Sequence, residues 1–177
     1  MASSIHKLRE GLSLSAPGFA LFISIILLII PLRLGQGFVP TPFFPLMIVF
    51  LYSVYEPNAL SAPVVFALGL LHDLLYGGSF GLWASVYLAM QYLVYTQREY
   101  LNGRVGRVIW LAFALATLSV ITLYWLEQSL LGGRWMPLMP LVTQTVLTIL
   151  LYPAASFLFF SLKIRAAAQR AERGEAG

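Results

Sequence analysis

Six apolar runs, separated by short stretches rich in glycine, proline and charge, are the feature that most restricts how this chain can fold. A helix that crosses a bilayer needs roughly 20 mostly apolar residues, with a range of about 17–25. Because the runs occupy nearly the whole chain, the sequence predicts an all-α integral membrane protein with six transmembrane helices. The second run is the shortest, and a tilted, broken or partly re-entrant segment is expected there. The runs cover residues 17–34, 41–55, 58–76, 80–97, 107–131 and 135–162.

The composition supports a membrane protein and excludes several other classes. Hydrophobic residues make up 59% of the chain and charged residues 10%, whereas a soluble domain has about 45–50% and about 25%. The absence of cysteine excludes disulfides, thiolate catalysis and cysteine-based metal sites. The net charge of +4 does not indicate nucleic-acid binding, because no basic cluster is interleaved with aromatic residues. In a membrane protein, basic residues set topology and contact anionic lipid.

The positions of the basic residues predict that both termini are cytoplasmic. With six spans and a cytoplasmic N-terminus, only Arg33 and Arg134 lie outside. This is the asymmetry of the positive-inside rule, and five or seven spans would remove it. The predicted organisation is a cytoplasmic segment 1–16, a six-helix transmembrane domain 17–162 and a basic cytoplasmic tail 163–177, into which the sixth helix continues. The nine basic residues on the inside are Lys7, Arg9, Arg98, Arg104, Arg107, Lys163, Arg165, Arg170 and Arg173.

The stretch GLLHDLLYGGSFG, residues 69–81, places His72 and Asp73 inside the third apolar run. Ionisable side chains in hydrocarbon are costly and need a partner. Residues three or four apart share a helical face, so Gly69 and Gly77 flank Asp73 on one face. Small residues let a neighbouring helix approach closely. We therefore expect Asp73 in a tight helix–helix seam, where it fixes the turn to the fourth helix together with Gly81; contact with a ligand is the alternative.

Several groups can compensate the Asp73 carboxylate at the outer end of the third helix. The N-terminus of the next helix favours an anion, so the backbone N–H groups of the turn and the hydroxyl of Ser79 are candidates. Arg33 and Arg134 are the basic residues that can reach it from the outer loops. His72 points about 100° away from Asp73 and is expected to be an interfacial polar side chain that hydrogen-bonds a neighbouring helix.

The patterns required for catalysis are missing. Asp73 is the only aspartate, which excludes an aspartyl dyad. His6 and His72 fall on opposite sides of the membrane, so a two-histidine metal site within one chain is not expected. An HExxH motif, a serine–histidine protease pair and a glycine-rich phosphate loop are all lacking. We expect no enzymatic activity, no metal and no cofactor.

Two further groups of residues suggest contacts. Gln144 and Thr148 lie one turn apart on the sixth span, and Glu127 lies on the fifth, so they are candidates for a polar face inside the bundle. Bonding between helices is favoured over a ligand site for these three. The outer loop GQGFVPTPFFP displays aromatic side chains between prolines, which suit either anchoring in the headgroups or an apolar contact with a partner. Its candidate contact residues are Phe38, Phe43 and Phe44.

Residues 63 and 69–81 resemble the signature of the rod shape-determining protein MreD family. That signature reads roughly G-L-x-x-D-x-x-x-G-x-x-x-G after a proline, here Pro63, and the chain length and span count are also similar. Ser79 replaces a proline often found between the second and third glycines, and His72 stands where glutamine is common. The signature covers about twenty residues, and the similarity in hydropathy and topology extends over the rest of the chain.

The resemblance implies a multi-pass protein of the bacterial inner (cytoplasmic) membrane that belongs to the cell-wall elongation complex. Relatives contribute to rod shape without known catalytic activity. Their partners are MreC, the MreB filament, RodA and a class B penicillin-binding protein, and the expected role is a scaffold that links MreC to the peptidoglycan synthase. The family fold is similar to the substrate-binding subunits of energy-coupling-factor transporters. A substrate-binding membrane subunit of a vitamin-type transporter is therefore the alternative function.

Overall fold

The computed structural model describes residues 17–28, 33–34, 37–38, 41–77, 79–133 and 135–175. The expected cytoplasmic segment 1–16 lies outside these residues. Within them the fold is all-helical apart from a short antiparallel pair of two-residue strands, β1 (Arg33–Leu34) and β2 (Gly37–Phe38). The helices follow the order of the six apolar runs. They are Pro17–Leu28, α2 (Phe44–Tyr55), α3 (Ala62–Tyr76), α4 (Leu82–Leu101), α5 (Gly106–Leu131) and α6 (Leu138–Glu175).

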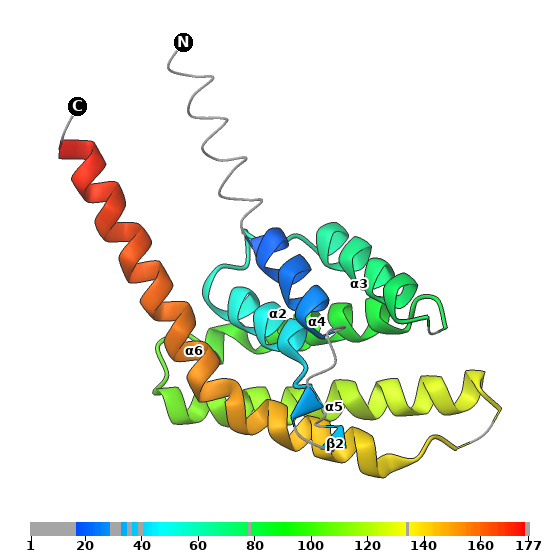
Figure 1. Ribbon diagram of the computed structural model, residues 1–177. Helices are drawn as coiled ribbons and strands as arrows, with labels where there is room; N and C mark the ends of the chain where they lie inside the picture. Colours follow the sequence, from blue (N-terminus) through cyan, green and yellow to red (C-terminus); the bar gives the residue numbers. More distant parts are fainter. Residues whose placement is uncertain are drawn as a thin grey trace.

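The helix boundaries follow from local sequence signals. Proline lies in the first turn of both α2 and α3, where its missing N–H has no intrahelical partner to lose. Gly77 ends α3 in the left-handed conformation, with φ of +71°, which glycine adopts without steric cost. α6 contains Pro153 and turns away from α5 along its second half (Figure 1). Proline inside a helix is a frequent cause of such a kink.

The hydrophobic core surrounds α2, which packs against α4, α5 and α6. Phe50 of α2 is fully buried and makes edge-on ring contacts with Phe113 of α5 and Tyr152 of α6, at centroid distances of 5.1 and 5.6 Å. Leu21 and Ile25 of the Pro17–Leu28 helix complete the same core. α4 packs against α3 and α5 as well. Eight of the 12 residues of α2 are buried, so this short helix lies at the centre of the core.

Large apolar side chains are exposed along α5 and α6, which supports a membrane protein. By length and composition, two helices of the described chain can cross a bilayer, Gly106–Leu131 and Leu138–Arg165. Only 28% and 22% of their most apolar windows are buried, whereas the core helix of a soluble protein would be mostly buried. Leu115 and Leu150, for example, are 68% and 63% exposed. Side chains of this kind in contact with water would oppose folding.

Candidate functional site

The turn between α3 and α4 is built around Asp73. The side chain is 1% exposed. Its Oδ2 accepts a hydrogen bond from the Gly81 backbone N–H and its Oδ1 accepts one from the Trp83 N–H, both at 2.9 Å. These donors lie at the N-terminus of α4, where the helix dipole favours a negative charge. The carboxylate of one helix thus caps the next one.

The other partners considered for Asp73 do not take this role in the described chain. The carboxylate receives no hydrogen bond from the Ser79 hydroxyl there, since Gly81 and Trp83 supply the donors instead. The side chain of Arg33 and the whole of Arg134 lie outside the described residues. Backbone N–H groups therefore account for the compensation that the structure shows.

Gly69 makes the closest helix–helix approach in the α3–α4 seam. A Cβ built on it would lie 2.4 Å from the Cα of Ala84 and 2.8 Å from its backbone nitrogen. These are backbone atoms of α4, so they cannot move aside as a flexible side chain would. Gly77 and Gly81 serve the turn differently, because both have positive φ (+71° and +94°) and open space around them. Close packing thus requires Gly69, and backbone conformation requires Gly77 and Gly81.

His72 is fully buried in an aromatic cluster beside Asp73. Its ring stacks on Trp83 at a centroid distance of 4.6 Å. Its Nδ1 lies 2.6 Å from the Tyr87 hydroxyl on α4, so the expected hydrogen bond to a neighbouring helix is present. Its Nε2 has no partner among the described residues. Tyr124 of α5 closes the cluster against Trp83, at 4.8 Å.

Phe43, in the aromatic loop before α2, is not displayed as expected. Phe43 is 3% exposed and packs on the Trp83 ring at 5.3 Å, so it cannot contact a partner in this state. The prediction for Phe43 was wrong because its ring reaches the His72–Trp83 cluster and is buried there. Phe44 is half-buried and lines a groove between helices. The side chain of Phe38 lies outside the described residues.

The polar side chains of α6 hold the segment before α2 in place. Gln144 Nε2 donates to the Thr41 carbonyl at 2.6 Å, and the Phe43 N–H donates to Thr148 Oγ1 at 2.9 Å. Non-helical backbone in a membrane is tolerated where protein groups satisfy its polar atoms. Glu127 lies apart from this pair and accepts a hydrogen bond from the Ser85 hydroxyl on α4 at 2.7 Å. The three residues make internal bonds in two places and do not converge on one cavity.

Replacing Thr148 by valine is expected to destabilise the protein by about 1–3 kcal/mol, the cost of leaving a buried N–H unsatisfied. Valine keeps the shape of threonine but cannot accept from Phe43. The measurement is the thermal midpoint of the variant in detergent. Thr143→Val is the matched control, because the Thr143 hydroxyl is exposed and bonds only within α6. Equal midpoints for the two variants would contradict this role of Thr148.

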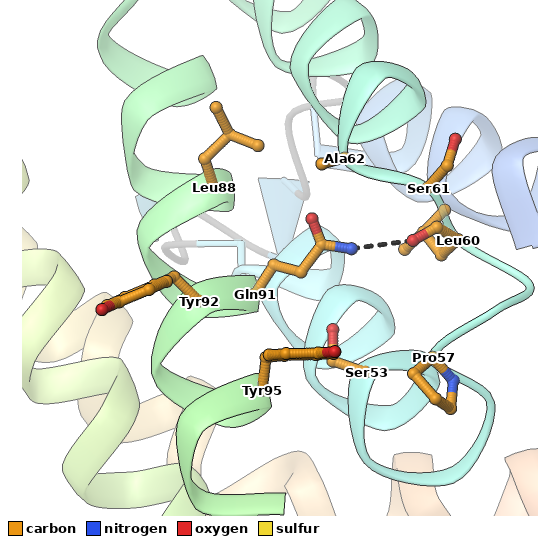
Figure 2. A pocket seen from close by; sticks show the side chains of 9 residues that line it. All are labelled: Ser53, Pro57, Leu60, Ser61, Ala62, Leu88, Gln91, Tyr92 and Tyr95. Carbon is orange, nitrogen blue, oxygen red and sulfur yellow. Dashed lines mark hydrogen bonds between the residues drawn. The ribbon is translucent and has the colours of Figure 1, made fainter.

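A smaller and a larger cavity lie between the described helices. The smaller, of about 420 Å³, lies between α4 and the end of α2 with the turn that follows. Figure 2 shows Gln91 reaching across it, where Nε2 donates to the Leu60 carbonyl at 2.7 Å. The hydroxyl of Ser53, a residue 3% exposed, lines this cavity without a partner in the described chain. Ser53 could not be predicted as a lining residue, since a lone serine in an apolar run carries no signal of its own.

The larger cavity is a groove of about 1090 Å³ bounded by the Pro17–Leu28 helix, α2 and α6. Its walls are mainly aliphatic and aromatic. Glu56 and Lys163 lie on its lining and form an ion pair. Among the residues expected to bind partners, only Phe44 faces this groove.

No family model, curated protein or solved structure matches the chain.

Proposed function

We propose that this chain is a non-enzymatic scaffold of the cell-wall elongation complex, held in the bacterial inner membrane by six helices with both termini in the cytoplasm. The scaffold binds MreC and links it to the peptidoglycan synthase. The observation that carries the proposal is the α3–α4 turn, where the residues of the MreD-like signature act together as one packed unit.

The chemistry of Asp73 favours a scaffold over an enzyme or a proton relay. Both carboxylate oxygens accept hydrogen bonds from backbone N–H groups at the start of α4, so the side chain is held in one position between the two helices. Neither oxygen is hydrogen-bonded to the side chain of another ionisable residue in the described chain, as a relay or a catalytic pair would require. Asp73 is therefore suited to fixing the angle between α3 and α4, and Gly69 lets the two helices meet at backbone contact.

The short helix α2 fits a membrane-embedded bundle because side chains of other helices satisfy the polar backbone atoms on either side of it. At about 1.5 Å per residue, the 12 residues of α2 cover about 18 Å, less than the roughly 30 Å of bilayer hydrocarbon. The non-helical segment before α2 extends this path, and Gln144 and Thr148 satisfy its backbone. Gln91 does the same for Leu60 at the other end of α2. A six-span arrangement thus leaves these polar backbone atoms satisfied.

The partners follow from the resemblance and from the exposed faces. The exposed apolar surfaces of α5 and α6 are available to the single-span MreC and to RodA, while MreB filaments and a class B penicillin-binding protein complete the complex. Membrane lipid covers what the partners leave open.

A crosslinked pull-down of the tagged chain from its native membrane tests this function. We expect MreC and the elongation synthase among the co-purifying proteins identified by mass spectrometry. Gly69→Leu, which breaks the α3–α4 seam, is expected to lose them, whereas Gly106→Leu, at a position with open space, should retain them. Recovery of a transporter transmembrane subunit with paired ATPases would contradict the scaffold.

A substrate-binding subunit of a vitamin-type transporter is the second candidate, and the smaller cavity favours it. Its volume of about 420 Å³ falls within the roughly 300–1,000 Å³ of small-molecule sites. Ser53 and Gln91 place polar atoms on its wall, which also includes Ser61, Tyr92 and Tyr95 (Figure 2). In this function the ligand would lie near Ser53, and the Gln144–Thr148 pair would remain structural.

A further inference from the structure

The large groove combines a long apolar floor with a charged end. Eighteen residues line it from three helices, and the polar part of the lining is small. Ala20, Ala154 and Ala155 leave space along its walls, while Phe44 and Leu151 contribute apolar surface at one end. In Figure 1 the second half of α6 diverges from the other helices. The groove is lined on α6 by residues between Leu151 and Lys163. A large exposed apolar surface commonly marks a binding site for a protein, a lipid or a ligand.

The length of the groove corresponds to one leaflet. Its lining on α6 runs from Leu151 to Lys163, and along α2 it runs from Phe44 to Glu56, the residue that follows the helix. Twelve residue steps at about 1.5 Å give about 18 Å on each helix. Half of the roughly 30 Å of bilayer hydrocarbon is about 15 Å. A spanning helix of a partner would need a groove nearly twice as long, whereas the acyl chains of one phospholipid need this length.

The charged end carries two opposite charges in reach of a headgroup. Lys163 and Glu56 form an ion pair, and their side chains are 34% and 41% exposed. The Lys163 ammonium also lies over the rings of Tyr52 and Phe159, 5.7 and 5.1 Å from their centroids. Tyrosine and lysine side chains commonly mark the membrane–water boundary. The pair therefore lies at the level of the headgroups while the groove continues into the hydrocarbon.

We propose that this groove binds one phospholipid of the cytoplasmic leaflet whose headgroup carries both a phosphate and a primary ammonium group, as in phosphatidylethanolamine. The phosphate accepts from the Lys163 ammonium, and the headgroup ammonium donates to the Glu56 carboxylate. The acyl chains lie between the Pro17–Leu28 helix, α2 and α6. This inference rests on the membrane location in the proposed function and does not depend on the scaffold role.

The headgroup choice follows from the charges. An ion pair has no net charge, so an anionic headgroup gains from Lys163 but is repelled by Glu56. A choline headgroup balances both charges, but its quaternary nitrogen has no N–H to donate to the carboxylate. A primary ammonium provides a charge-assisted hydrogen bond at Glu56. Phosphatidylethanolamine is thus expected to bind better than either phosphatidylcholine or phosphatidylglycerol with the same acyl chains.

Native mass spectrometry of the delipidated full chain, titrated separately with these three lipids, tests the proposal. We expect roughly threefold to tenfold stronger binding of phosphatidylethanolamine, a modest factor because the charged pair is partly exposed. Glu56→Gln should remove the preference over phosphatidylcholine, and Lys163→Gln should weaken all three lipids. Glu99→Gln and Arg104→Gln are the charge controls, since both side chains are exposed and lie outside the groove.

A steric pair of variants separates groove binding from surface binding. Ala154→Trp fills the groove and should abolish lipid retention, whereas Phe157→Trp, on an exposed part of α6 outside the groove lining, should leave it unchanged. The proposal would be overturned if the three headgroups bound equally or if Ala154→Trp retained lipid. It would also be overturned if a partner helix co-purified in place of lipid. If the lipid preference were found but MreC were missing from the pull-down, only the scaffold proposal would be overturned. If the chain could be extracted from the membrane without detergent, both the scaffold and the lipid proposals would be overturned.

Discussion

Gly69→Ala is expected to lower the stability of the protein by about 3 kcal/mol or more, a large effect for the addition of one methyl group. The new Cβ would lie 2.4 Å from the Cα of Ala84, so α3 and α4 must separate. Overpacking a core typically costs about 1–3 kcal/mol, and this case is at the upper end because the obstruction is backbone. The thermal midpoint of the purified variant in detergent measures the effect.

Gly106→Ala and Gly18→Ala are the matched controls for this substitution. A Cβ at Gly106 meets nothing within 4 Å, and one at Gly18 lies 3.4 Å from the Val64 Cγ1, an ordinary contact. Alanine is the better helix former by roughly 0.5–1 kcal/mol, so both variants should match or exceed the wild-type midpoint. If Gly69→Ala were as stable as these controls, the close α3–α4 contact would be wrong.

Asp73→Leu is expected to destabilise the α3–α4 turn by about 3–6 kcal/mol. Each hydrogen bond to a charged group contributes about 1.5–3 kcal/mol, and the Gly81 and Trp83 N–H groups would both lose their acceptor. In a chain of this size each kcal/mol corresponds to roughly 2–4 °C in the midpoint, so a fall of about 10 °C is expected. The variant should also lose the partners recovered in the pull-down.

Asp73→Asn refines this experiment because it keeps one acceptor oxygen and the side-chain volume. Its loss should be about half that of Asp73→Leu, since the amide NH₂ must face one of the two backbone donors. Glu99→Gln controls for the removal of a carboxylate, because Glu99 is exposed on α4. Wild-type stability in both Asp73 variants would show that the carboxylate does not hold the turn.

The order of helices could be predicted from hydrophobicity because each apolar run is long and bounded by breakers. The starts of α3 and α4 differ from the expected run starts for local reasons. α3 begins at Ala62 instead of residue 58, since Pro63 favours the first turn of a helix. α4 begins after Gly81, whose φ of +94° is incompatible with a helix. The sixth helix continues to Glu175, which confirms the prediction that it extends into the basic tail.

The site was predictable where its partners are close in sequence and not where they are distant. Asp73 and Gly81 are eight residues apart, so a carboxylate before a glycine-rich turn already suggests a cap. The bond between Gln144 and Thr41 joins residues 103 apart, and only the packed fold brings them together. Phe43, in the loop before α2, is likewise buried against the Trp83 ring of α4, a contact between residues 40 positions apart in the chain.

Membrane crossing is the claim on which both the scaffold and the lipid proposals depend, and single-cysteine labelling tests it most directly. The chain has no native cysteine, so each substituted residue is the only thiol. Asn58, Phe80, Asn102 and Pro137 are exposed in four successive turns between α2 and α6. We expect a membrane-impermeant maleimide added to intact spheroplasts to label Phe80→Cys and Pro137→Cys. Labelling of Asn58→Cys and Asn102→Cys should require permeabilisation, and equal labelling of all four before permeabilisation would contradict the six-span arrangement.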